Sequence, residues 1–537
     1  MLRRAMLVAA GLACGAGCIG DARDSVARSQ GPVRSPLDVA PPPAALLEGR
    51  GPLPATKPAL EPNESPLPIN FATALQLAGA RPLDVQIAGR QVEAAAAQYD
   101  RARLLWVPNL VLGTDYFAHT GPQQNFAGEI LKSNRDTFMA GFGPNVVFSF
   151  SDAVYAPLAA RQDLRARQFH QQASINDTSL QVAEAYFGVQ QARGELAGAL
   201  LAEKHATELA RRAAELAKGL APPADENRAK VELARRRQLV QTARERWRVA
   251  SAELARLLRL DPNATLEPIE PAFLPVTVID SHVSLDTLIP IALGSRPELA
   301  GHQAVVQAAL ARLKQEKIRP LVPSLALRSV STNPSGSLGY GAFGGGPNDR
   351  LDHFAPRFDI DVQLLWEFQS LGFGNRARMQ ERRAEHEIAT LELFRTQDRI
   401  AAEVAKAFAE VRSAAERLGQ AEPALREAID LVNKSLEGLG QTRRAGDAVL
   451  LVVRPQEAVA AVQALGQANA DFFTAVSDYN RAQFRLYRAL GHPAQCLAGA
   501  IAESPVEAAT ATEPVGPRAG IGSAAPSDVT PAIPTVK

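Results

Sequence analysis

The sequence predicts a mainly α-helical chain with a small β part, arranged as an internal duplication. The hydrophobic fraction is 46% but only 6% of residues are aromatic, and alanine supplies much of the apolar content. Such a composition suits long helices packed closely against one another better than a thick globular core. Two short segments alternate between apolar and polar residues, and these predict the β part.

The two halves of the chain share six residues at a constant spacing, as in Arg81 and Arg296 (296 − 81 = 215). The six pairs are Gly79 and Gly294, Arg81 and Arg296, Pro82 and Pro297, Pro108 and Pro323, Leu110 and Leu325, and Leu112 and Leu327. We therefore expect one repeat over residues 69–280 and another over 281–493. A Pro/Ala-rich linker at 19–68 and a disordered tail at 494–537 are expected outside the repeats.

Each repeat is expected to contain a helical stretch, a strand hairpin, a very long helix and a return helix. The predicted helical segments are 70–104, 155–218 and 224–260 in the first repeat, and 285–318, 375–440 and 448–490 in the second. At about 1.5 Å per residue, a helix of some 60 residues reaches roughly 90 Å, so these helices are rods. Pro222–Pro223 and the region from Gly438 to Gly446 predict the tips of two helical hairpins.

The predicted strands have one apolar and one polar face. The residues predicted to face lipid are Phe138, Phe142, Phe148, Phe358, Ile360, Val362, Leu364 and Trp366. The residues predicted to line a lumen are Asp359, Asp361, Gln363 and Glu367. This alternation is typical of transmembrane barrels, although a half-buried sheet in a soluble sandwich shows it too. The carboxylates could favour cations, or serve only to wet the lumen.

A membrane barrel built from these strands requires several copies of the chain. Unpaired backbone groups are not tolerated in a bilayer, so spanning strands must close into a barrel. Four strands per chain are too few, whereas three copies would supply about twelve. The same symmetry would gather the rods into a helical barrel that extends the pore.

The N-terminus has the layout of a secretory signal peptide at residues 1–18. Arg3 and Arg4 precede an apolar run over 5–12, and small residues lead to Cys18. The sequence leaves open whether Cys18 is lipidated or the signal is cleaved in the ordinary way. No later stretch reaches about 18 uncharged apolar residues, as a transmembrane helix requires.

The sequence predicts no catalytic, cofactor-binding or metal-binding residues. Its net charge of +1 gives no reason to expect nucleic acid as a partner. Gly339, Gly341 and Gly344 have the spacing of a dinucleotide-binding loop, but no helix is predicted directly after them, so a flexible loop at an outer mouth is expected. His386 lies between two glutamates that face other directions on a helix, which favours a solvated surface.

The order of elements, together with several local motifs, resembles the TolC-like outer-membrane efflux family over residues 65–493. The motifs are Ala407-Phe408, Arg444-Ala445-Gly446 followed by an apolar run and Gln456, and Arg488-Ala489-Leu490-Gly491. The resemblance implies a homotrimer with a β-barrel in the lipid of the cell outer membrane and a periplasmic helical extension. It also implies a passive conduit of a tripartite efflux or type I secretion system, docked onto a periplasmic adaptor and an inner-membrane pump.

The segment after the tip glycine departs from the family pattern. Family members often carry acidic residues there, whereas this chain has the apolar run Val449–Val453 and then Arg454. Leu451 and Arg454 are therefore candidate gate residues, closing the pore by dewetting and disfavouring cations. Alternatively, the run packs the hairpin and Arg454 faces solvent; Pro455 is expected to kink the helix. An exported soluble helical-rod scaffold or periplasmic adaptor remains the alternative function.

Overall fold

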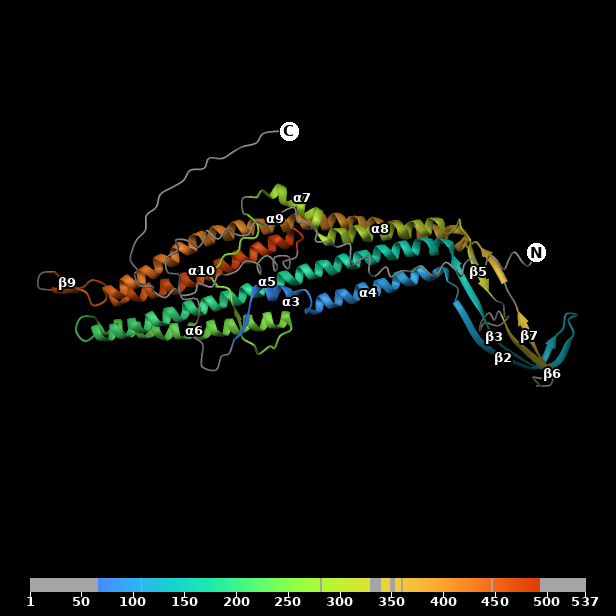
Figure 1. Cartoon of the computed structure of the whole chain (residues 1–537), viewed down its shortest axis with the longest axis horizontal. Coiled ribbons are helices and arrows are strands. Elements are labelled where there is room, and N and C mark those ends of the chain that lie inside the picture. The colour runs from blue at the N-terminus through green and yellow to red at the C-terminus, as the bar shows by residue number, and fades with distance from the viewer. Residues whose placement is uncertain are drawn as a thin grey trace, which may run out of the picture.

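The protein is elongated, with its helices side by side along the long axis and most of its strands at one end (Figure 1). The computed structural model describes residues 66–107, 109–280, 283–328, 340–347, 353–358, 361–445 and 448–492. Cys18 and the predicted signal peptide, nearly all of the predicted linker and the predicted tail lie outside these ranges. Within them, no helix combines the length and hydrophobicity that crossing a bilayer requires.

The helices of the first half are α3 (Phe71–Ala78), α4 (Leu83–Arg103), α5 (Phe150–Leu216) and α6 (Pro223–Leu258), with a short 3-10 turn at Leu104–Trp106. The Asn70 side chain caps α3 by accepting the Thr73 amide at 2.8 Å. Pro223 occupies the first turn of α6, where the amide that proline lacks would have no helical partner. With 67 residues, α5 is a rod of about 100 Å.

The helices of the second half are α7 (Leu285–Ser295), α8 (Pro297–Ile318), α9 (Phe373–Gly438) and α10 (Pro455–Ala489), with a 3-10 turn at Gln369–Gly372. The expected start of the return helix near 448 is wrong, because Ala448–Leu451 forms strand β10 and pairs with β9 (Thr442–Ala445). The kink expected at Pro455 is also wrong: Pro455 is the first residue of α10. The division into two sequence repeats stays a prediction.

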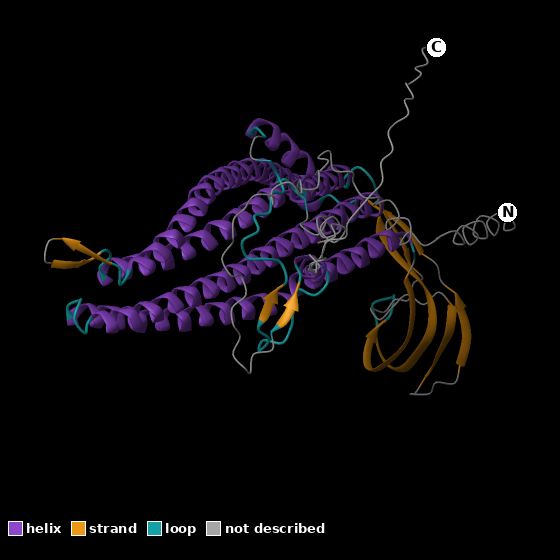
Figure 2. Ribbon diagram, turned by 60° about the vertical axis from the view of Figure 1, so that its left-hand side comes forward, coloured by secondary structure: helices purple, strands orange, loops and turns teal. Residues whose placement is uncertain are grey.

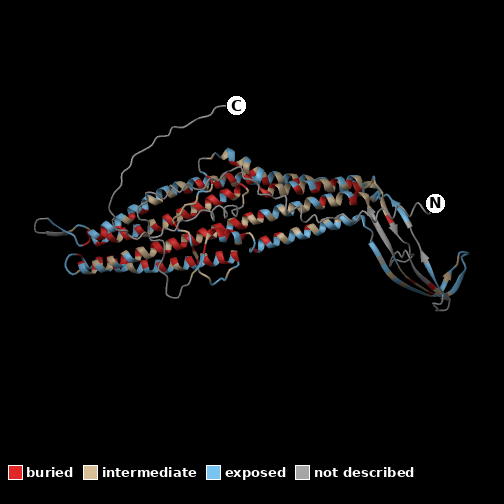
Figure 3. Cartoon of the chain, in the orientation of Figure 1, coloured by how far each residue is buried: buried red, intermediate tan, exposed pale blue. Residues whose placement is uncertain are grey.

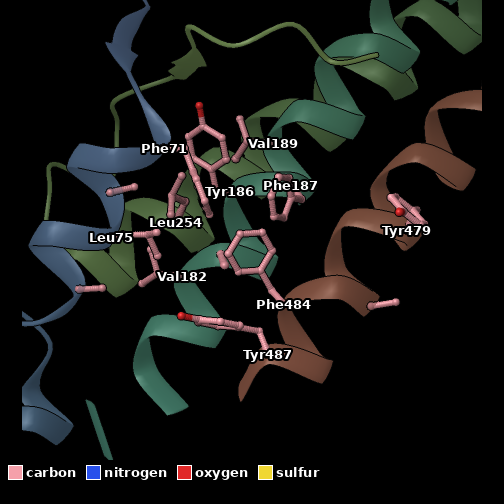
Figure 4. Packing of buried hydrophobic residues seen from close by; sticks show 14 of the residues in the cluster. Phe71, Leu75, Val182, Tyr186, Phe187, Val189, Leu254, Tyr479, Phe484 and Tyr487 are labelled. Carbon is pink, nitrogen blue, oxygen red and sulfur yellow. The ribbon is translucent and has the colours of Figure 1, made fainter. Parts of the chain in front are cut away.

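Buried alanines and a few aromatic residues hold the rods together, and Figure 3 shows the buried residues along the inner sides of the helices. In the main cluster, the Phe71 ring lies 5.1 Å from the rings of Tyr186, Phe187 and Phe484 (Figure 4). Beside it, strands β1 (Leu67–Ile69) and β4 (Leu266–Pro268) pair in parallel. The cluster therefore joins α3 and the middle of α5 to the C-terminal part of α10.

The large sheet is antiparallel, and Figure 2 shows it curving away from the helix ends. Its strands are β2 (Asn109–Gln124), β3 (Ile130–Ser149), β5 (Ser324–Arg328), β6 (Tyr340–Pro347), β7 (His353–Phe358) and β8 (Asp361–Leu365). β3 pairs with β2 along one edge, and with β5 and then β6 along the other. β8 pairs with β5, and β7 with β6. The strands thus form four rows: β2, β3, β5 with β6, and β8 with β7.

Candidate functional site

The strand register places the predicted lipid-facing residues of the four rows on one face. Cross-strand partners project to the same side of an antiparallel sheet, and residues two apart along a strand do likewise. Phe148 is opposite Leu325, which is opposite Leu364, and the next such row ends at Val362. The same face of β3 continues through Phe142 and Phe138. In the backbone register, Phe358 is opposite Tyr340, the partner of Phe142. We call this the apolar sheet face.

The apolar sheet face is strongly exposed in the single chain. Leu112 is 81% exposed, Val362 61% and Leu364 54%. The Phe354 ring lies across Gly344, where an added Cβ would sit 2.3 Å from a ring carbon, and its centroid is 6.5 Å from that of Phe138. Contiguous apolar surface of this kind is rare on soluble monomers and marks contact with lipid or another protein.

The opposite face receives Gln363, one of the four predicted lumen residues. Asp361 pairs in register with Arg328, and Gln363 with the fully buried Ala326. Asp359 lies outside the described residues, as does Ile360 of the predicted lipid face. The contact of each face with lipid or lumen stays a prediction.

Trp366 and Glu367 were expected within the last strand, and this is wrong: the strand ends at Leu365. The strand ends there because its partner strand does: Leu365 is opposite Ser324, which is the first residue of β5 and follows Pro323 directly. Glu367 instead accepts a hydrogen bond of 3.0 Å from the Gln369 side chain.

The loop expected around the glycine-rich segment is also wrong for the residues described. Gly341 and Gly344 belong to β6, whose backbone pairs with β3 on one side and β7 on the other. Gly339 lies outside the described residues. His386 lies on α9, where its carbonyl accepts a hydrogen bond of 2.8 Å from Thr390. Across the described ranges, no three histidine, cysteine or carboxylate side chains gather as a metal site would need.

Both long edges of the sheet are open in the part of the chain that is described. β2 pairs only with β3, while β7 and β8 each pair on one side only. An edge strand presents a row of unpaired amide and carbonyl groups. The sheet can therefore accept a further strand at each edge.

The predicted gate residues lie at the other end of the molecule. Leu451 is opposite Thr442 in the β9–β10 hairpin, is half-buried and packs against a cluster that includes Leu436 and Val462. Arg454 is exposed and immediately precedes α10, where the Glu457 carboxylate accepts its backbone amide at 3.4 Å. Sequence reasoning missed the hairpin, which also carries the exposed Arg443 and Arg444.

Polar contacts join the two helical hairpins close to this tip. Arg236 and Glu232 of α6 form a buried ion pair of 2.6 Å, and Gln463 of α10 donates to Glu232 at 2.7 Å. Gly466 makes the approach possible, since an added Cβ would lie 2.0 Å from the Arg236 guanidinium. These contacts, which sequence patterns did not reveal, hold α6 against α10.

A second connection between the hairpins starts from the α5 helix. Arg212 donates to the Leu436 carbonyl at the end of α9 and also to Glu208. Hydrogen bonds from Arg211 and Arg212 lower the pKa of Glu208 to about 2. The Glu208 carboxylate is therefore ionised at neutral pH and can keep Arg212 oriented toward α9.

Paired helical rods that end in an open sheet with one apolar face give this chain the fold of several solved outer-membrane channels. Solved structures with this fold include the Campylobacter jejuni CmeC outer membrane channel, at a TM-score of 0.64 and 15% identity over 79% of this chain and 85% of that one. The outer-membrane channel OprN matches at 0.62 and 16%, over 78% and 89%. The open state of the Neisseria gonorrhoeae MtrE outer membrane channel matches at 0.60 and 15%, over 83% and 97%. No protein-family model and no curated protein sequence matches the chain.

Proposed function

We propose that this chain is an outer-membrane channel subunit of a tripartite efflux or type I secretion system. Three copies form a passive conduit from periplasm to exterior, with the sheet in the outer membrane and the rods in the periplasm. A periplasmic adaptor and an inner-membrane pump drive solute through it, and the chain itself performs no catalysis.

The observation that carries this proposal is the exposed apolar sheet face on a sheet with two open edges. Lipid can cover the apolar face, but it cannot satisfy the backbone groups of the edges. Pairing of β2 with the β7–β8 row of another copy removes both edges at once. Four rows from each of three copies give about twelve strands, within the range of known membrane barrels.

The rods favour the same assembly. α9 and α10 enclose an open groove of about 1100 Å³, with Ala421, Ala424, Ala428, Ala464 and Ala468 among its lining residues. Small side chains allow helices to approach closely. A neighbouring copy can therefore lay a helix along this groove and close the helical tunnel.

Membrane conductance tests the proposal. Purified full-length protein added to a planar lipid bilayer should give discrete current steps of uniform size, since each assembled barrel encloses a continuous water-filled path. An exported soluble scaffold or adaptor would leave the bilayer current unchanged, and that result would reject the channel function.

A charge reversal at Arg454 tests whether this candidate gate residue influences ion selectivity. If Arg454 lies near the pore axis, Arg454→Asp reverses three symmetry-related charges, and the channel should shift toward cation selectivity. Reversal potentials under a salt gradient measure this shift. Arg426→Asp is the matched control, because Arg426 is exposed on α9 and bonds only to Glu422 among the described residues.

Leu451→Ser tests the apolar residue of the candidate gate at the tip. Since Leu451 packs against the helical cluster, the hydroxyl should loosen the β9–β10 hairpin and ease wetting of a closed tip. Higher single-channel conductance and greater entry of large antibiotics into cells are the expected results. If both variants conduct and select as the parent does, the gate lies elsewhere.

A further inference from the structure

A charged pocket lies between α8 and α9 where these helices approach the sheet. Its volume is about 530 Å³, and its lining residues are Arg312, Gln315, Glu316, Arg319, Arg378, Glu381 and Arg382. Along α8 the lining residues recur at helical spacings of three and four, and those of α9 do the same, so one face of each helix borders the pocket. Figure 1 shows the two helices side by side up to β5.

The chain around this pocket is much more basic than the protein as a whole. Residues 310–319 and 373–383 together contain eight arginines and lysines and two glutamates, whereas the whole chain has 58 basic and 57 acidic side chains. We call these two segments the basic collar. A local excess of this size creates a positive potential that attracts anions.

Only part of this charge is neutralised within the chain. Arg312 and Arg319 bond to Asp163 and Asp152 of α5, and Arg382 bonds to Glu385 at 2.7 Å. Arg319 also forms an ion pair of 3.5 Å with Glu316 in the pocket lining. Arg378 is exposed, and no described carboxylate lies within ion-pair distance of it. The exposed Arg378 guanidinium therefore remains available to an anion, as do Nε and Nη2 of Arg382, which contacts Glu385 through Nη1.

Exposed apolar residues lie at the end of the basic collar that is nearer to the sheet. Leu321 is 75% exposed, Phe368 61% and Phe373 73%. Arg378 follows Phe373 by five residues, or about 8 Å along the helix. The headgroup layer on each side of a bilayer is roughly 5–8 Å thick, so a bilayer that ends at Phe373 places Arg378 at headgroup depth.

We propose that the basic collar binds the phosphates of anionic phospholipids, such as phosphatidylglycerol, in the leaflet that faces the helices. The planar guanidinium forks of Arg378 and Arg382 match phosphate oxygens in geometry and charge. The lipid chains extend from there along the exposed apolar residues toward the apolar sheet face. This inference rests on the proposed function, because it requires the sheet to lie in a membrane.

Lipid binding by purified full-length protein tests the inference. Native mass spectrometry counts bound lipids after the protein is mixed with phosphatidylglycerol or phosphatidylcholine, and the variant Arg378→Gln/Arg382→Gln is compared with the parent. The control is Arg412→Gln/Arg426→Gln, which also removes one exposed arginine and one arginine paired with a nearby glutamate from α9. These two positions lie roughly 50–65 Å away along the helix.

The parent and the control should prefer phosphatidylglycerol over phosphatidylcholine. In the collar variant, the ratio of bound phosphatidylglycerol to bound phosphatidylcholine should fall at least about fivefold, which is the effect of removing one basic residue near an anionic surface. Equal preference in all three proteins would overturn the inference. So would a collar variant with altered ion selectivity and unchanged lipid binding, because the pocket would then face the lumen.

Insertion into phosphatidylcholine vesicles, measured in parallel, separates this inference from the proposed function. Insertion without any preference for phosphatidylglycerol sinks the lipid site and leaves the channel function standing. Failure to insert into vesicles of phosphatidylcholine, with or without added phosphatidylglycerol, overturns both.

Discussion

The double variant Val362→Arg/Leu364→Arg should fail to assemble in the outer membrane. Both side chains lie on the apolar sheet face and are more than half exposed in the single chain. An arginine that faces lipid costs roughly 2–4 kcal/mol at the bilayer midplane and less toward the interfaces, and an oligomer multiplies that cost by its number of copies. The amount of protein in outer-membrane fractions, and its oligomeric form on mild detergent gels, measures the loss.

Gln363→Arg is the matched control for this variant, because Gln363 lies between the two residues and projects from the other side of β8. In a water-filled lumen the added arginine stays hydrated, so assembly should remain near the parent level. Normal assembly of the double variant would contradict the assignment of the lipid face. Equal damage from Gln363→Arg would show that β8 tolerates no charge on either face.

Arg236→Leu should destabilise the periplasmic part of the protein by about 3–5 kcal/mol. Arg236 and Glu232 are only 7% and 3% exposed, and removal of the arginine leaves a buried carboxylate whose remaining partner is the Gln463 amide. Urea denaturation in detergent, followed by helical circular dichroism, measures the change. Because the pair holds α6 against α10, the variant should also conduct more readily.

Two further variants distinguish the lost ion pair from a packing defect. The double change Arg236→Leu/Glu232→Leu removes both charges, so it should recover most of the lost stability. Arg237→Leu breaks an exposed contact of 3.4 Å to Glu203 and should cost about 1 kcal/mol or less. If Arg237→Leu proves as harmful as Arg236→Leu, burial of the ion pair is not the cause.

The architecture was predictable because its signals are local and periodic. Long alanine-rich stretches with helical spacing predicted the rods, and α5 and α9 are observed where these patterns lie. Pro222–Pro223 located the first tip correctly, since proline breaks one helix and suits the start of the next. Strand alternation located the sheet, and the register then showed which residues share a face.

The errors arose where distant partners decide local structure. Val449–Leu451 has an apolar composition compatible with a helix, but β9 pairs with it and delays α10 to Pro455. The glycine-rich segment near 340–347 is a strand because β3 and β7 supply its hydrogen bonds. The hydrogen bond from Gln463 to Glu232 joins residues 231 positions apart in the sequence, and no periodicity within one helix can indicate such a contact.

The molecular mass of the protein extracted from outer membranes tests the central claim most directly. Light scattering of the detergent-purified full-length protein, corrected for bound detergent, should give three times the mass of one chain, because only additional copies can close the open edges of the sheet. A stable monomer in the outer-membrane extract would contradict the account, since four rows of strands cannot form a closed barrel alone.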